Sequence, residues 1–168
     1  MKGKINTISK KVTLLNEAIL SSMVQANDKV IIKNFTETGI KILGANFGFA
    51  WWKFSDKEDY KLAYKSPSTP YNPFVPRKNG GHSAAIKTKK PFFDTNVKKK
   101  NYGLSDISPY MKSYVIIPIS HSNHLYGGLT LCYKKQHHFT EEELTLAEAI
   151  GSTTAQAITI YNLLENEK

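Results

Sequence analysis

The side chains that could carry chemistry in this chain are few, and the first is its single cysteine, Cys132. A thiol becomes a nucleophile or an oxidant sensor when its pKa is lowered, but one cysteine alone forms neither an internal disulfide nor a CxxC metal knuckle. Free cysteines are among the most frequently buried residues, so the sequence favours a packing role for Cys132. A redox-active thiol stays open as the alternative.

The five histidines are the second group, and two of them, His137 and His138, are adjacent. Imidazole nitrogens suit zinc, yet a structural zinc site needs about four ligands, which this pair does not supply. The sequence also shows no nucleophile beside a base, no glycine-rich phosphate loop and no paired carboxylates at a recognisable spacing. The prediction is a protein with no catalytic residue and no metal site.

Lysines dominate the charge of the chain, which has 23 Lys and Arg against 14 Asp and Glu and a formal net charge of +9. Such a balance can attract nucleic acid or an acidic membrane surface. Arginine forks, which carry much of base and phosphate recognition, are nearly missing, because Arg77 is the only arginine. The charge therefore indicates a well-solvated surface, and a lysine-driven nucleic-acid-binding module is the less favoured alternative.

Length and composition describe an ordinary globular protein. The chain has 168 residues, of which 40% are hydrophobic and 11% aromatic, and this suits one domain with a sizeable core. No apolar run approaches the roughly 18–20 residues that a membrane span needs. The N-terminus is basic but lacks the apolar segment of a signal peptide. We therefore expect a cytoplasmic protein that does not enter a membrane.

Apolar residues recur at helical spacing at both ends of the chain. Near the N-terminus they form a narrow stripe, which consists of Ile5, Ile8, Val12, Leu15, Ile19 and Met23. This spacing predicts a helix over residues 5–26, followed by a second over 30–43 that stops at Gly44. A capping box formed by Thr140 and Glu143 opens the last helix. The N-terminal stripe can pack on the core of its own domain or on a second copy, and we expect a homodimer.

Between these helices the sequence alternates strands and turns. The predicted strands are rich in β-branched and aromatic residues and cover residues 45–54, 60–65, 91–95, 114–119 and 125–133. Gly127 and Gly128 lie inside the last strand, where bare backbone lets another group approach closely. Four prolines make residues 66–80 a long irregular loop, a short helix follows it, and residues 98–113 form a second loop. Loops of this length are uncommon unless they are functional or disordered.

The order of these segments resembles a GAF domain over residues 29–164. The resemblance is carried by GANFGFAWW, GGHSAAIKTKKPFFDTN, SYVIIPI, LYGGLTLCYKK and FTEEELTLAEAIGSTTAQAI, in that order. It implies an α+β fold with an antiparallel sheet of five to six strands. Helices from both termini would cover one face, and a ligand pocket would lie under the long loops on the other. We accordingly expect residues 1–28 to be an N-terminal dimer or linker helix and residues 29–168 to be the GAF domain.

Members of this family are usually sensors, so the resemblance implies a non-catalytic regulatory module of signal transduction that binds a small molecule and relays binding through its terminal helices. The chain lacks the NKFDE-like residues of the cyclic-nucleotide branch. Cys132 lies in a strand rather than at a bilin attachment site, and the loop before Ser113 has no haem-binding histidine. The cofactor or ligand is thus unidentified. The enzymatic alternative is a protein similar to free methionine sulfoxide reductases that uses Cys132 with an external thiol.

Strand alternation and the family's pocket position together predict the pocket wall. Five of the predicted residues share one sheet face, and these are Phe49, Trp51, Tyr64, Thr130 and Cys132. Four polar residues are expected above them, and these are His82, Asp94, Asn96 and Ser113. A mostly apolar wall with a few convergent polar groups is the usual composition of a small-molecule site.

Overall fold

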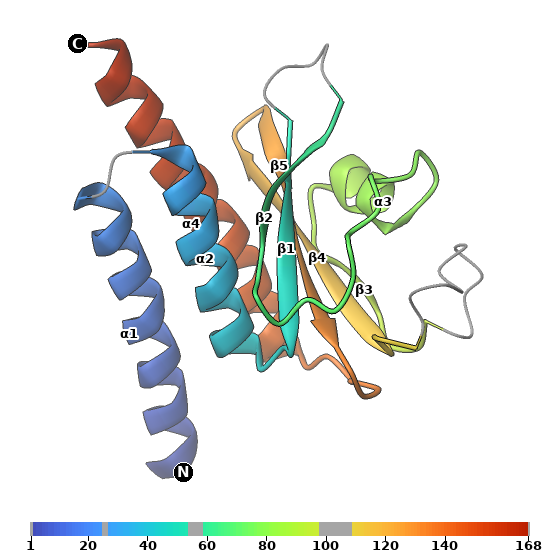
Figure 1. The fold of residues 1–168 in the computed structure, drawn as a ribbon. Helices are drawn as coiled ribbons and strands as arrows, with labels where there is room; N and C mark the ends of the chain where they lie inside the picture. Colours follow the sequence, from blue (N-terminus) through green and yellow to red (C-terminus); the bar gives the residue numbers. More distant parts are fainter. Residues whose placement is uncertain (1, 25–26, 54–58, 98–108, 168) are drawn as a thin grey trace.

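The computed structural model of the protein describes residues 2–24, 27–53, 59–97 and 109–167. Figure 1 shows helices on one side of an antiparallel sheet, and a short helix with long loops on the other side. Parts of two predicted connections, residues 54–58 and 98–108, lie outside the described residues. The predicted fold class is confirmed by this arrangement.

The sheet has five described strands in the order β2-β1-β5-β4-β3, and all neighbours are antiparallel. The strands are β1 Phe47–Trp52, β2 Lys61–Lys65, β3 Phe92–Asp94, β4 Ser113–His121 and β5 His124–Tyr133. The two longest, β4 and β5, form a central hairpin whose turn contains Ser122 in the left-handed region, with φ 54°. Each strand presents alternate residues to the two faces of the sheet.

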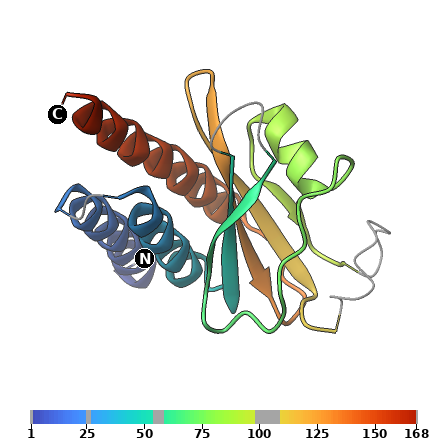
Figure 2. The same cartoon turned by 45° about the horizontal axis from the view of Figure 1, so that its top comes forward.

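Three long helices cover one face of the sheet in two layers, as both views show (Figures 1 and 2). They are α1 Lys2–Val24, α2 Asp28–Leu43 and α4 Glu141–Asn166. The second and third pack on the sheet, and α1 lies outside both of them. The predicted stop at Gly44 is confirmed by its φ of 66°, and the predicted capping box of Thr140 and Glu143 is confirmed in full.

The sheet face that α2 and α4 cover, called the helix face here, carries Ala50, Ile117 and Leu129 and is closely packed. A Cβ atom at Gly151 of α4 would stand 2.5 Å from the carbonyl oxygen of Pro118 in β4. Likewise, a Cβ atom at Gly48 of β1 would stand 2.8 Å from the Leu131 side chain. At Gly151 the helix therefore meets strand backbone directly, whereas Gly48 leaves room for side chains of β5 and of α2, where Ile40 Cγ1 would stand 3.3 Å from the added Cβ.

The outer helix α1 divides its apolar stripe between two environments. Leu15 and Ile19 pack against the core, whereas Ile8 and Val12 are 41% and 47% exposed. The Lys11 ammonium lies 3.2 Å from a Glu142 carboxylate oxygen and ties α1 to the start of α4. The side chains of Ile5 and Met23 lie outside what the structure describes. Among the described helices, none is both long and apolar enough to cross a bilayer.

Candidate functional site

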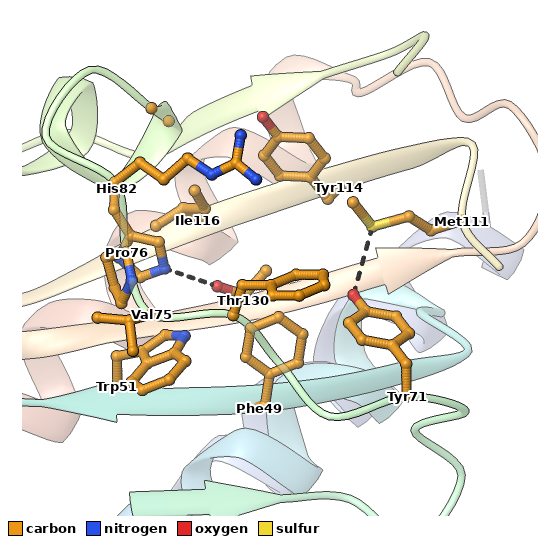
Figure 3. A pocket seen from close by; sticks show the side chains of 14 residues that line it. Phe49, Trp51, Tyr71, Val75, Pro76, His82, Met111, Tyr114, Ile116 and Thr130 are labelled. Atoms are coloured by element: carbon orange, nitrogen blue, oxygen red, sulfur yellow. Dashed lines mark hydrogen bonds between the residues drawn. The ribbon is translucent and has the colours of Figure 1, made fainter. Parts of the chain in front are cut away.

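A cavity of about 90 Å³ lies on the other face of the sheet, called the pocket face here (Figure 3). Its floor consists of Phe49, Trp51, Ile116 and Thr130. The floor follows from strand register, because Phe49 and Ile116 both stand directly opposite Thr130, one on each side of β5. Directly paired residues of neighbouring strands project to the same face, so three strands contribute one contiguous wall.

Helix α3, Gly81–Thr88, closes one end of the cavity with His82. The Nε2 atom of His82 lies 3.1 Å from Thr130 Oγ1, a hydrogen bond drawn in Figure 3. Gly128 makes this position possible, since a Cβ atom there would stand 3.2 Å from the imidazole Cε1. The close approach that the sequence predicted at this glycine is therefore the approach of His82.

Burial sets the protonation state of this histidine. Desolvation lowers the pKa of His82 from its ordinary 6.5 to about 4. The ring is accordingly neutral at pH 7, with one nitrogen as a donor and the other as an acceptor. Together with the Thr130 hydroxyl it gives the cavity a polar but uncharged end.

The proline-rich loop, residues 66–80, covers the cavity, and hydrogen bonds to β1 hold its first residue in place. The Ser66 amide donates to the Gly48 carbonyl at 2.9 Å, and the Gly48 amide donates to Ser66 Oγ at 3.1 Å. Further along, Tyr71 packs edge-on against Phe49, with ring centroids 6.3 Å apart. The loop then lines the cavity with Phe74 and Val75, which remain 54% and 59% exposed.

Of the nine predicted pocket residues, the four that line the cavity are Phe49, Trp51, His82 and Thr130. Cys132 is on the pocket face but fully buried, opposite Phe47 and below the cavity, and so lies outside its lining. Burial raises the pKa of the Cys132 thiol, which keeps it protonated. It packs as a small hydrophobe, as the sequence favoured.

Three other predicted pocket residues hold strand ends together instead of lining the cavity. Asp94 Oδ1 accepts a hydrogen bond from the Asn96 amide at 2.9 Å. Ser113 Oγ donates to the Thr95 carbonyl and accepts from the His137 amide, both at 2.8 Å. Backbone groups thus occupy one Asp94 oxygen and the Ser113 hydroxyl, while the buried Asp94 Oδ2 has no hydrogen-bond partner among the described residues. The predicted place of these three residues in the pocket wall is not what the structure shows.

The prediction that Tyr64 shares the pocket face is wrong. Tyr64 pairs with Ala50, a residue of the helix face, and its hydroxyl donates a hydrogen bond to Glu37 of α2. The reason is a register irregularity in the β1–β2 pair between Ala50 and Trp51. Such an irregularity changes which residues share a face.

Sequence reasoning missed the residues that complete the wall. They come from the proline-rich loop, the start of α3, the approach to β4 and β4 itself, and they are Tyr71, Phe74, Val75, Pro76, Arg77, Gly80, Gly81, Met111, Tyr114 and Ile116. Ile116 could have been predicted, because alternation along β4 places it on the same face as Tyr114. The loop residues carry no periodic signal that would have assigned them.

The paired histidines do not form a metal site with other described residues. His137 stacks on Tyr133, with ring centroids 4.2 Å apart, and its Nε2 lies 2.8 Å from Glu143 Oε1. This arrangement fastens the chain before α4 to the end of β5. Within the described part of the chain, no group of three or more His, Cys, Asp or Glu side chains could hold a metal ion.

Comparison with known proteins gives one family and one fold. The family model of the GAF domain matches residues 25–159. The GAF domain of an Acinetobacter phosphoenolpyruvate-protein phosphotransferase superposes with a TM-score of 0.75 at 9% identity, covering 92% of this chain and 95% of that one. A free methionine-R-sulfoxide reductase from Neisseria meningitidis, in complex with its substrate, gives 0.73 at 11% identity, covering 92% and 91%.

A fragment of a methyl-accepting chemotaxis protein also superposes, with a TM-score of 0.71 at 14% identity, covering 88% of this chain and 98% of that one. No curated protein sequence matches the chain. At such identities the structural likeness establishes the fold, while the role depends on the site itself.

Proposed function

The chain belongs to the GAF domain family, whose members are in general sensory and regulatory domains, and from that premise we propose that it binds a small molecule in the cavity and relays binding to a signalling output. One observation carries the proposal: an apolar cavity on the pocket face with a neutral His82–Thr130 pair at one end. Small-molecule sites typically combine an apolar wall with a few placed polar groups.

The surroundings of the single thiol favour ligand binding over catalysis. The likeness to a methionine sulfoxide reductase shows that this fold can host an enzyme. Cys132, however, has no exposed surface, and burial raises its pKa, so both access and thiolate formation are unfavourable. The reductase alternative needs a reactive Cys132, and the surroundings of this residue argue against one.

The relay would run through β4, whose neighbouring residues serve opposite faces. Ile116 lines the cavity, and Ile117 packs in the core of the helix face. The next residue, Pro118, offers the carbonyl oxygen that meets α4 at Gly151. Because backbone touches backbone there, a displacement of β4 would be felt by α4. A ligand that prefers one position of β4 would shift the population of helix positions accordingly.

A second copy of the chain is the partner that we propose for the terminal helices. The exposed apolar side chains of α1 and α4 are Ile8, Val12, Leu20, Ile160, Leu163 and Leu164. Pairing the helices of two copies would remove this apolar surface from water. In this arrangement α1, Lys2–Val24, is the output helix within the segment 1–28, and 29–168 is the ligand-binding domain.

Ligand binding is tested by a library of small fragments, screened by saturation-transfer NMR on the purified chain. Val75→Trp places a large ring at the partly exposed mouth of the cavity, and Gln156→Trp adds the same ring to an exposed position of α4, away from the cavity. We expect fragments that bind the wild type and Gln156→Trp but not Val75→Trp. Fragments that bind all three proteins equally, or no binding at all, would contradict the proposed site.

Light scattering tests the dimer at about 100 μM, roughly a hundred times a micromolar dissociation constant. Val12→Glu puts a charge on the exposed part of the stripe, and Thr13→Glu puts the same charge on the next exposed residue. The wild type and Thr13→Glu should be dimers, and Val12→Glu a folded monomer. Leu15 is less suitable for this test, because it packs against the core. A monomeric wild type would remove the proposed output surface.

A further inference from the structure

The volume of the cavity limits the size of what it can enclose. It measures about 90 Å³, whereas an engineered apolar cavity that accepts benzene is larger, at about 150 Å³. Scaled from the six carbons of benzene, the enclosed part of a ligand has roughly four non-hydrogen atoms. Phe74 and Val75 at the rim are more than half exposed, so the rest of the ligand can lie against them and reach water.

The walls of the cavity offer such a molecule a surface without charge. Phe49, Trp51 and Ile116 form a buried apolar floor. Beside this floor the Tyr71 hydroxyl donates to the Met111 sulfur at 3.8 Å, a contact drawn in Figure 3. Burial raises the pKa of Tyr71, so the phenol stays protonated at pH 7.

One hydroxyl in the cavity has unused hydrogen-bonding capacity. Thr130 is buried and lines the cavity, and His82 Nε2, at 3.1 Å, is the hydrogen-bond partner of its side chain among the described residues (Figure 3). A hydroxyl can donate once and accept twice, so this one bond leaves two positions open. Because bulk water reaches little of a buried side chain, a molecule inside the cavity is the partner that these positions can take.

The neutral imidazole of His82 lets this hydroxyl face either kind of ligand group. Burial lowers the pKa of His82 to about 4, so at pH 7 one ring nitrogen carries a proton and the other does not. With the proton on Nε2, the ring donates to Thr130, whose own hydrogen is then available to a ligand acceptor. With the proton on Nδ1, Thr130 donates to Nε2, and its oxygen accepts from a ligand donor.

An ion would lose its hydration in this cavity without gaining a counter-charge. No acidic side chain occurs among the described lining residues, so a cation has no anionic partner there. Arg77 is the permanently charged residue of that lining, and it already has an interaction partner, so it is not a free cation for an anionic ligand. Desolvation costs an isolated ion far more than it costs an amide or a hydroxyl. The cavity therefore selects against charge of either sign.

We infer that the ligand is an uncharged molecule whose enclosed end carries one carboxamide or hydroxyl group in contact with Thr130 beside His82, and whose short alkyl part lies on the apolar floor. The inference rests on the proposed function, since it names the ligand class of the same site. Carboxylates, ammonium compounds and zwitterionic amino acids fall outside this class.

Three probes of one shape and different charge test the inference, namely isobutyramide, isobutyrate and isobutyramidine. Each carries the same isopropyl group on a planar head, which at pH 7 is neutral in the amide, anionic in the acid and cationic in the amidine. Each is titrated into the full chain at pH 7 and one ionic strength, and the dissociation constant is taken from protein chemical shifts. Isobutyramide should bind about tenfold or more tightly than either ion. Equal binding of the three, or tightest binding of either ion, would overturn the inference.

Variants of Thr130 test which group makes the contact. Thr130→Val keeps the shape of the side chain but removes the hydroxyl, and it should weaken isobutyramide by about three- to tenfold, the range of one neutral hydrogen bond. Thr130→Ser keeps the hydroxyl and should stay within about twofold of the wild type. Thr145→Val makes the same replacement at an exposed position of α4, outside the lining, and should leave binding unchanged. Unchanged binding in Thr130→Val, or equal weakening by Thr130→Val and Thr130→Ser, would overturn the assigned contact.

Failure of the inference is distinguishable from failure of the proposed function. If library fragments bind in a manner that Val75→Trp abolishes while isobutyramide is not preferred over the two ions, the cavity is a ligand site and the uncharged class is wrong. If neither the fragments nor the three probes bind, the proposed function itself fails. The probe series uses the wild type, so it decides the ligand class even where Thr130→Val does not fold.

Discussion

The two faces of the sheet are built from the same strands but are covered in opposite ways. On the helix face, α2 and α4 lie so close that a glycine Cβ would meet strand backbone or a core side chain. On the pocket face, a proline-rich loop and one short helix enclose a cavity and leave Phe74 and Val75 more than half exposed. The helix face is thus closed by packed helices, whereas the cover of the pocket face leaves a cavity with a partly exposed rim.

The adjacent isoleucines of β4 give the sharpest test of this contrast. Ile117 is fully buried on the helix face, so Ile117→Ala should lower the free energy of unfolding by about 4 kcal/mol. Ile116 already borders the cavity, so Ile116→Ala should lower it by only about 2 kcal/mol. Denaturant unfolding at pH 7 measures both. Equal losses would mean that the cavity is not a persistent void.

Acidification should destabilise the folded chain through protonation of His82 on the pocket face. Its pKa is about 4 in the folded chain against an ordinary 6.5, so the unfolded chain binds the proton more tightly. Stability contributed by the neutral ring is present above pH 6.5 and is lost as pH falls from 6.5 towards 4, by at most about 3 kcal/mol.

The measurement for His82 is the free energy of unfolding as a function of pH, compared between the wild type and His82→Gln. The variant should lose most of the slope between pH 4 and 6.5. His138→Gln, which alters an exposed side chain, serves as the control and should keep the slope. A slope unchanged in His82→Gln would show that other groups cause the acid sensitivity.

A single methyl group tests the contact between α4 and β4. Gly151→Ala forces a Cβ atom to within 2.5 Å of the Pro118 carbonyl oxygen, and we expect a loss of about 2 kcal/mol in the free energy of unfolding. Gly80→Ala, in the cavity lining, places its Cβ at an ordinary 3.6 Å from the Arg77 carbonyl oxygen, and because Gly80 is the N-cap of α3 the loss should be up to about 1 kcal/mol. Thermal or denaturant unfolding that ranks the two variants the other way would refute the contrast.

The smallest effect is expected at the buried thiol. Cys132→Ser introduces a hydroxyl into an apolar site and should lower the free energy of unfolding by about 1–2 kcal/mol. Binding of library fragments should persist in the variant. If the wild type instead reduces free methionine sulfoxide with a thiol donor and Cys132→Ser does not, the protein is an enzyme and the binding role is wrong.

Much of the fold follows from signals that are local in the sequence. Helical periodicity, the Gly44 stop and the capping box at Thr140 predicted the helices, and strand alternation predicted the faces of Phe49 and Thr130. Tyr64 was misplaced because strand register depends on an irregularity near Ala50 that composition does not reveal. Periodicity predicts which residues share a face within one helix or strand. It does not predict how two strands align when their pairing is irregular.

The site was predictable only where regular strands build it. Polar residues such as Asp94 and Ser113 look alike in sequence whether they bind a ligand or a neighbouring backbone group, and here backbone amides and a carbonyl are their partners. Arg77 and Val75 reach the cavity from an irregular loop, whose path depends on hydrogen bonds to β1 made far back at Ser66. Tertiary contacts determine this path, and no local sequence pattern indicates it.

The position of the His82 ring beside Gly128 has a consequence for how the sequence of this pocket can change between related chains. A Cβ atom at residue 128 would stand 3.2 Å from the imidazole Cε1, which is tighter than an ordinary contact, so a side chain at 128 would require the ring at 82 to shift. In related chains with the same pocket, the two positions should vary together: a ring at 82 with glycine at 128, or a smaller residue at 82 once 128 has gained a side chain. Ligand preference could therefore change in one paired step without disturbing the helix face.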